Sequence, residues 1–229
     1  SRSFDIPIID DEFTESAEAM RVRIFNASGG GTVVPPSYST VIIEDDESSG
    51  SSGGIKLDGA NGTVYTVALD GTGQVILGGE FSNVNGRDLP RLAKVSQKGL
   101  VDDAFDLGAG PNNTIYKVAL SSDGGYWVGG LFSQVGDTVV SHVAKLNSDG
   151  SLDDSFHSTA VNGTVFDILE VEEGLLVGGD FGLAMLNADG SNNEAFMSPE
   201  LDGAVYAISA SPGRRIVIAG GFTTVNGEK

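Results

Sequence analysis

Carboxylates are the side chains in this sequence best suited to chemistry, and calcium binding is the chemistry that suits them. The chain has 32 aspartates and glutamates against 13 lysines and arginines, a formal net charge of −19. The acids gather in two runs near the start of the sequence, Asp10-Asp11-Glu12 with Glu15 and Glu18, and Glu44-Asp45-Asp46-Glu47. Ca2+ prefers carboxylate and carbonyl oxygens in a flexible geometry. If the two runs meet at one end of a domain, a calcium ion would hold them together; as solvated turn acids they would bind none.

The same composition excludes several other classes of partner. Binding to nucleic acid needs a basic face that replaces counterions, and this chain is strongly acidic. No apolar run is long enough to span a bilayer, so we expect no direct membrane insertion. The chain has no cysteine, which excludes disulfides and thiol chemistry.

Catalytic motifs are missing from the sequence. The two histidines, His142 and His157, have no nucleophile motif beside them, and there is no phosphate-binding loop or zinc-protease motif. A pair of acids could act as in a glycosidase, but the abundance of acids singles out no pair. The sequence therefore predicts a protein that is not an enzyme, with a hydrolase or lyase on a propeller as the less favoured alternative.

The acidic runs lie within a region of predicted strands. Apolar and polar residues alternate around Phe4–Ile8, Met20–Ile24 and Val41–Ile43, which is typical of half-buried strands. A Gly/Ser-rich stretch follows and predicts a linker over residues 48–56. We therefore expect one domain over residues 1–47 and another over residues 57–229.

The second region repeats itself. Aromatic residues recur at intervals of about 40 to 50 residues, and Gly-Gly pairs recur with them, starting at Gly78, Gly129, Gly178 and Gly220. This period and the turn-rich composition predict β-propeller blades of three or four strands. The predicted units span residues 57–106, 107–157, 158–197 and 198–229, the last of them truncated.

The repeats resemble the delta-60 family of predicted β-propeller repeats. The resemblance rests on GEFSNVNG (79–86), KLNSDGSLDDSF (145–156) and GGFTTVNG (220–227). It implies a large bacterial exported protein and no particular biochemical activity.

The first region resembles the C-terminal part of a Calx-β domain, a calcium-binding sandwich of the immunoglobulin type. The matching segments are PIIDDEFTESAEAM (7–20) and STVIIEDDE (39–47), and the first strands of that family are absent. The resemblance implies the following Ca2+ ligands: Asp10, Asp11, the main-chain carbonyl of Phe13, Glu15, Glu18, Asp45, Asp46 and Glu47. The expected fold class is all-β, a partial immunoglobulin-like sandwich followed by consecutive propeller-type blades.

Together these features predict a non-enzymatic, calcium-binding structural or adhesion module of a secreted or cell-surface repeat protein. The expected partners are neighbouring domains or subunits of the same protein. We expect the polypeptide to continue in both directions beyond the incomplete end modules; in the alternative, neighbouring subunits complete them, as in a filament. The alternative is a propeller that binds surface glycans or proteins through the loops after each Gly-Gly-x-Phe. The sequons at Asn61, Asn112 and Asn162 predict turns more strongly than glycan attachment, and Asp-Gly pairs such as Asp149-Gly150 predict turns more strongly than cation sites.

Overall fold

The computed structural model describes residues 18–23, 38–43, 59–158, 161–213 and 215–229, and every regular element in these ranges is a β-strand. The first two strands, β1 (Glu18–Arg23) and β2 (Tyr38–Ile43), form an antiparallel pair. They confirm the strands predicted around Met20 and Val41. The described part of the chain contains no helix that could cross a membrane.

Four small antiparallel sheets follow along the chain. The first contains β3 (Thr63–Leu69), β4 (Val75–Glu80) and β7 (Leu92–Val95). The second contains β8 (Ile115–Leu120), β9 (Tyr126–Gly130) and β12 (Val143–Leu146). The third contains β13 (Val165–Val171), β14 (Gly174–Gly179) and β15 (Gly182–Leu186). The described part of the fourth contains β16 (Val205–Ser211) and β17 (Arg215–Gly220).

Two short hairpins project from the first two sheets, in the loops that the third unit lacks. They pair β5 (Asn83–Val84) with β6 (Arg87–Asp88) and β10 (Gln134–Val135) with β11 (Thr138–Val139). Asn85 at the first tip has a left-handed backbone with a φ of 51° and is followed by Gly86 at 80°. This Asn-Gly pair is the residue combination that a tight hairpin turn requires.

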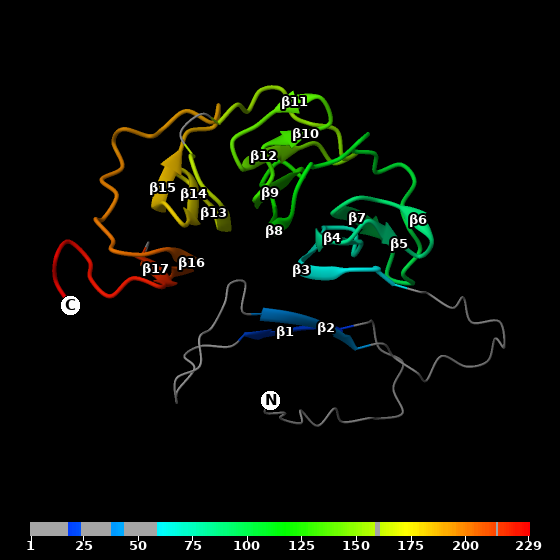
Figure 1. Ribbon diagram of the computed structural model, residues 1–229, viewed down its shortest axis with the longest axis horizontal. Helices are drawn as coiled ribbons and strands as arrows, with labels where there is room; N and C mark the ends of the chain where they lie inside the picture. The colour runs from blue at the N-terminus through cyan, green and yellow to red at the C-terminus, as the bar shows by residue number, and fades with distance from the viewer. Residues whose placement is uncertain (1–17, 24–37, 44–58, 159–160, 214) are drawn as a thin grey trace.

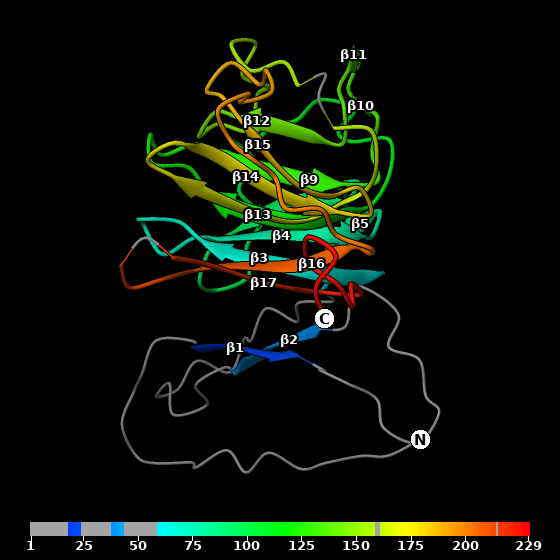
Figure 2. The ribbon, with the colours of Figure 1, turned by 90° about the vertical axis from the view of Figure 1, so that its left-hand side faces the viewer.

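The four sheets follow one another round an arc, with their first strands on the inside (Figure 1). Each first strand contacts the first strand of the next sheet, in the order β3, β8, β13 and β16. From the side, the strands of successive sheets lie one above another (Figure 2). This is the arrangement expected of propeller blades. The strand β2 lies beside β3, at the start of the arc.

Glycine at one position of each second strand allows the sheets to approach. A Cβ atom on Gly78 would lie 2.8 Å from Cγ2 of Ile115 and 2.9 Å from Cγ2 of Val118, which belong to the next sheet. Gly129 and Gly178 face the third and fourth sheets in the same way. No side chain fits in these gaps, so the first three glycine pairs have a structural role.

The prediction that Gly220 is equivalent to Gly78, Gly129 and Gly178 is wrong by one residue. The register pairs Val205 with Gly220 and Ala207 with Ala219, as Val165 pairs with Gly179 and Asp167 with Gly178. Ala219 therefore occupies the position that glycine holds in the other three sheets.

Polar side chains on the first strands tie neighbouring sheets together. The Thr66 hydroxyl accepts a hydrogen bond from the Val118 backbone N–H at 3.1 Å, and the Asp167 carboxylate accepts one from Ile208 N–H at 2.7 Å. Lys117 forms an ion pair with the same Asp167 at 2.6 Å. Each sheet is thus joined to the next by specific polar contacts as well as by apolar packing.

Candidate functional site

The predicted calcium ligands fall almost entirely outside the described residues. Glu18 begins β1, and its Cα atom lies opposite that of Ile43 at the end of β2. The other predicted ligands, Asp10, Asp11, Phe13, Glu15, Asp45, Asp46 and Glu47, lie outside the described ranges. Within those ranges, no group of three or more histidines, aspartates and glutamates could hold a metal ion.

The Asp-Gly turns are structural elements of the blades, as predicted. The Asp149 carboxylate accepts hydrogen bonds from the Ser151 N–H at 3.0 Å and from its hydroxyl at 2.7 Å. The main-chain carbonyl of Asp149 accepts a further bond at 2.8 Å from the N–H of Asp106, in the segment that follows the first sheet. The loop therefore packs one blade against the preceding one.

The sequon asparagines at Asn61 and Asn112 also have a structural role. The side-chain oxygen of Asn112 accepts hydrogen bonds from the backbone N–H groups of Ser133 and Gln134 at 3.0 and 3.2 Å. Its amide nitrogen donates to the Ser133 hydroxyl at 3.2 Å. Asn61 makes the same three contacts in the first sheet, and Asp202 takes this position in the fourth.

Several groups with perturbed pKa values lie at the interfaces between neighbouring sheets. At the first interface the Lys94 ammonium lies 3.0 Å from the Asp70 carboxylate and 3.1 Å from the hydroxyl of Tyr126 in the second sheet. The side chains of Lys94 and Asp70 are only 9% and 7% exposed, so the ion pair is buried. The Tyr126 ring packs edge-on against Phe105, with 5.7 Å between ring centroids.

Hydrogen bonds keep this buried pair charged. Burial raises the pKa of the Asp70 carboxyl, but hydrogen bonds from Thr72, Lys94 and Gln74 outweigh it and hold that pKa well below its ordinary value. Burial lowers the pKa of Lys94, but Tyr126 and Asp70 outweigh it and the pKa is raised. The group is a fully partnered structural ion pair, and the charged form of each member is the stable one.

The second interface uses a different ring and different acids. Lys145, which is equivalent to Lys94, pairs with Asp123 and lies 3.2 Å from Asp153. Its ammonium lies 5.5 Å from the centre of the Trp127 ring, and that ring packs edge-on against Phe156 at 4.9 Å. The hydrogen bonds from Lys145 and from a backbone N–H lower the pKa of Asp123 to about 2.

The indole of Trp127 is also linked to the third sheet. Its N–H donates to the Glu170 carboxylate at 3.0 Å, and Ser122 donates to the same carboxylate from its N–H and its hydroxyl. Burial raises the pKa of Glu170, but the hydrogen bonds from Ser122 and Trp127 outweigh it, so the pKa lies below its ordinary value.

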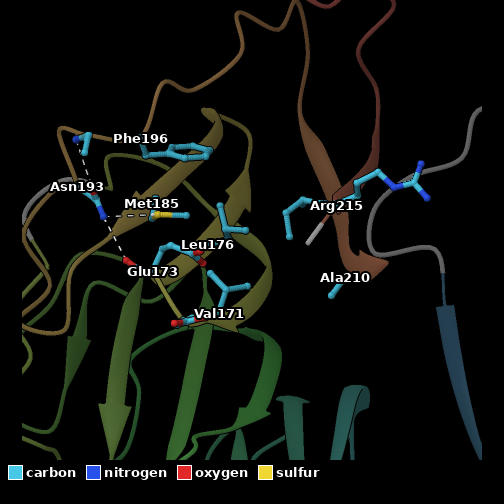
Figure 3. Close-up of a pocket in the computed structure, with 11 residues that line it drawn as sticks. Val171, Glu173, Leu176, Met185, Asn193, Phe196, Ala210 and Arg215 are labelled. Carbon is cyan, nitrogen blue, oxygen red and sulfur yellow. Dashed lines mark hydrogen bonds between the residues drawn. The ribbon is translucent and has the colours of Figure 1, made fainter. Parts of the chain in front are cut away.

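At the third interface the described residues in the positions of these lysines and of Tyr126 are neither basic nor aromatic. Met185 stands where the first two sheets have Lys94 and Lys145, and Ile216 stands where the second sheet has Tyr126. A hollow of about 530 Å³ remains here, and its lining residues come from the third and fourth sheets (Figure 3). Phe196, Leu176 and Met185 form one wall, and the fourth sheet faces them across the gap.

A row of aromatic rings runs along the inner strands of all four sheets. Tyr65, Tyr116, Phe166 and Tyr206 each occupy the position where the register between the first and second strand shifts by one residue. Successive ring centroids are 5.1, 5.6 and 5.4 Å apart, and the rings meet edge to face or tilted. The rings are half-buried, and the bulge directs each one towards its neighbour.

The two histidines serve the backbone of their blades. His142 precedes β12 with a left-handed backbone at a φ of 63°, as Arg91 precedes β7 at 67°. The carbonyl of His142 accepts a hydrogen bond from Gly130 N–H at 3.0 Å, and the N–H of His157 donates to the Asp189 carbonyl at 2.9 Å. The contact of His142 lies at the end of the β9–β12 pairing, and the contact of His157 joins the second blade to the third.

Sequence reasoning missed the ion pairs of Lys94 and Lys145, although a signal for them was present. Lys94 and Lys145 each sit third in a four-residue strand whose other members are apolar, LAKV and VAKL. A lysine inside such a short buried strand requires an acidic partner. The partner can be identified only from the fold, since Asp70 comes from the turn after β3 and Tyr126 from the next sheet.

Comparison with known families supports the class of fold. The model of a family described as a domain of unknown function (DUF5122) beta-propeller matches residues 121–156. This stretch covers β9 to β12 and the segment that ends at Phe156. No curated protein matches the chain. The matched stretch and the four sheets define the chain as an all-β protein that contains β-propeller repeats.

Proposed function

We propose that the chain is part of a non-enzymatic structural or adhesion protein of the cell surface or extracellular space, in which Ca2+ stiffens the N-terminal module. That module is the partial immunoglobulin-like sandwich of the Calx-β type, and the propeller-type blades follow it. Its partners are neighbouring domains or subunits of the same protein.

One backbone observation carries the calcium part. Glu18 begins β1 directly opposite Ile43, the last residue of β2. The first acidic run leads into Glu18 along the chain, and the second run begins with the residue after Ile43. Two acidic segments that leave one end of an antiparallel pair supply enough carboxylate oxygens for the six to eight ligands of Ca2+.

The non-enzymatic part is supported by how the perturbed groups of the blades are used. Lys94 is held by the buried Asp70, Lys145 by Asp123 and Asp153 of its own blade, and Glu170 by an indole and a serine. A catalytic acid or base must reach a substrate. These groups instead contact one another within a blade or, at Tyr126 and Glu170, between neighbouring sheets, where they contribute to packing and order.

Calcium-dependent melting tests the proposal. Extracellular modules bind Ca2+ with a Kd of about 10⁻⁴ to 10⁻³ M, and an ion at about 100 times its Kd stabilises a fold by about 2.7 kcal/mol. We expect a melting transition that rises with Ca2+, falls with a chelator, and no longer responds to Ca2+ in the variant Asp45→Asn/Asp46→Asn. Asp149→Asn, which changes a turn acid in the second blade, is the matched control and retains the response. A protein that contains no calcium and melts at one temperature with and without chelator would refute calcium binding.

A propeller that binds glycans or proteins is the second candidate, and the aromatic row supports it. Half-buried rings on adjacent first strands form an apolar surface along the inside of the arc, and the C–H groups of a sugar can pack on such a surface. Glycan-array or partner binding that is lost in Tyr116→Ala and kept in Tyr116→Phe would favour this function. Equal binding by all three proteins would exclude the aromatic row as the site.

A further inference from the structure

Asn162 differs from the two sequon asparagines that occupy its position in the first and second units. Asn112 holds the loop of its unit through three hydrogen bonds to Ser133 and Gln134. The third unit lacks this loop, because a tight turn joins β14 to β15. Asn162 is exposed, and its side chain makes no hydrogen bond to any residue that the structure describes. Its amide is therefore without the restraint that holds Asn61 and Asn112.

The residue that follows Asn162 is a glycine, and the fold favours glycine there. A Cβ atom at position 163 would overlap the Asp180 carboxylate, which would have to move. Without a Cβ, the main-chain nitrogen of Gly163 is open to the side chain before it. Neither Asn162 nor Gly163 belongs to a strand, and the Gly163 N–H makes no hydrogen bond within the described part of the chain. The amide and the nitrogen beside it are both free to react.

We propose that Asn162 is a site of spontaneous deamidation in the folded protein. The main-chain nitrogen of Gly163 attacks the side-chain carbonyl carbon of Asn162 and loses its proton as the new N–C bond forms. The C–N bond of the side-chain amide breaks, and its nitrogen takes up a proton and leaves as ammonia. A five-membered succinimide ring remains.

Water then opens the succinimide at one of its two carbonyl groups. Opening at the side-chain carbonyl gives aspartate, and opening at the main-chain carbonyl gives isoaspartate. The whole reaction consumes one water and releases one ammonia, so it needs no enzyme, oxidant or cofactor.

Three further Asn-Gly pairs in the sequence serve as internal comparisons, and in each the asparagine is held. Asn61 makes the three loop contacts described above. Asn85, at the tip of the β5–β6 hairpin, accepts one hydrogen bond at 2.8 Å and donates another at 2.7 Å, both to main-chain groups. Asn226 accepts one at 2.9 Å from a main-chain N–H. In these pairs hydrogen bonds must break before the nitrogen can attack.

The reaction would alter the junction between the second and third sheets. Val161 and Val165, on either side of the pair, are 3% and 0% exposed and belong to the apolar cluster that these two sheets share. Isoaspartate routes the main chain through the side chain and so adds one methylene between the two valines, which a close-packed interface cannot absorb without shifting. Aspartate changes only the charge, and Asp202 already occupies the equivalent position in the fourth unit.

Peptide mapping by mass spectrometry tests the site on the full chain after incubation in mildly alkaline buffer. We expect Asn162 to gain the mass of an amide-to-acid exchange at least about tenfold faster than Asn85, because each hydrogen bond that must break slows the attack several-fold. In protein unfolded by urea, the two sites should react at similar rates, since the same dipeptide is then unrestrained in both.

Two variants separate the isoaspartate from the added charge. The aged protein should accept methyl groups from isoaspartyl methyltransferase and should melt at least about 2 °C lower than fresh protein. Fresh Asn162→Asp, which carries the charge on a normal main chain, should melt as the fresh parent does. Aged Asn162→Gln should accept few methyl groups and keep its melting temperature.

Three results would overturn the proposal. One is equal rates at Asn162 and Asn85 in the folded chain. Another is a rate at Asn162 that rises on unfolding as much as the rate at Asn85 does, because Asn162 would then be restrained by the fold. The third is methyl acceptance in aged Asn162→Gln that equals that of the parent, which would place the isoaspartate elsewhere in the chain.

Discussion

Replacing Lys94 by methionine provides the sharpest test of how the sheets are held together. The third sheet carries Met185 at the equivalent position, so methionine is compatible with this part of the fold. In the first sheet, methionine at position 94 would remove the ammonium partner of the Asp70 carboxylate. The Asp70 side chain is only 7% exposed, so it would remain buried without that partner. The Tyr126 hydroxyl would lose the same contact, which is 3.1 Å long.

The expected cost follows from what Asp70 retains. Removing one partner of a buried ion pair costs about 3–5 kcal/mol. Asp70 keeps hydrogen bonds from the Thr72 N–H, the Thr72 hydroxyl and the Gln74 N–H, at 2.8, 2.7 and 2.9 Å. We therefore expect Lys94→Met to lower the free energy of unfolding by about 3 kcal/mol, at the low end of that range. For a protein of this size, such a loss lowers the Tm by about 6–12 °C.

A double-mutant cycle measured by urea unfolding separates lost charge pairing from lost packing. Asp70→Asn keeps an oxygen for the turn but removes the charge, so it strands Lys94 in the same way. The double variant buries no unpaired charge, and its destabilisation should be smaller than the sum of the single values by about 2 kcal/mol. Lys98→Met, a change at an exposed lysine of the next turn, is the control, with an expected effect below about 0.5 kcal/mol. Additive effects, or a loss below about 1 kcal/mol in Lys94→Met, would refute a buried ion pair that stabilises through its charge.

Three further predictions concern single contacts. Gly129→Ala should lower the free energy of unfolding by about 1–3 kcal/mol, because the new Cβ would lie 2.6 Å from a β13 side chain. The control Gly71→Ala, whose Cβ would have nothing within 4 Å, should leave that free energy unchanged in the same urea assay. Trp127 fluorescence followed through an acid titration should report a midpoint below about 4.3, the ordinary pKa of glutamate. The lowered pKa of Glu170 means that its contribution to stability is present above that ordinary value and is lost as the pH falls through the lowered one. Asn112→Ala should cost about 1 kcal/mol of unfolding free energy, whereas Asn112→Asp should be tolerated, as the fourth sheet shows.

Each of these predictions has a clear contrary result. A tolerated Gly129→Ala would mean that the second and third sheets do not approach as closely as described. A Trp127 midpoint above the ordinary glutamate pKa would mean that burial outweighs the hydrogen bonds. Equal losses for alanine and aspartate at position 112 would mean that the amide donor, rather than the acceptor, holds the loop.

Internal alignment of the sequence predicted the repeating sheets well, for a physical reason. A blade is formed by residues close together in sequence. Its glycine and aromatic positions recur because each blade packs against the next blade through the same positions. The strands around Val64, Ile115 and Val165 accordingly lie where the repeats placed them. The exception is the fourth glycine pair. Ala219 occupies the position of Gly78, Gly129 and Gly178, and the sequence alone does not show the strand register that places it there.

The contacts between sheets could not be predicted in the same way. Lys94 of the first sheet binds Tyr126 of the second, and Trp127 of the second sheet binds Glu170 of the third. These pairs join residues far apart in sequence, and the positions of Tyr126, Trp127 and Glu170 carry different residue types in the other repeats. An alignment that seeks what is common among repeats discards such positions. The calcium ligands remain a prediction, since all but Glu18 lie outside the described residues.

The different chemistry of the three interfaces has a consequence for how the chain reaches its native order. Near-identical repeats can stack out of sequence, within one chain or between neighbouring chains, and this is a common failure of repeat proteins. If the first sheet met the third or fourth in place of the second, Lys94 would face a leucine or isoleucine where it now meets the Tyr126 hydroxyl. The smaller side chain would also leave part of the space of the phenol ring empty beside Phe105. The lysine therefore penalises wrong neighbours, and the order of the blades is encoded in their differences.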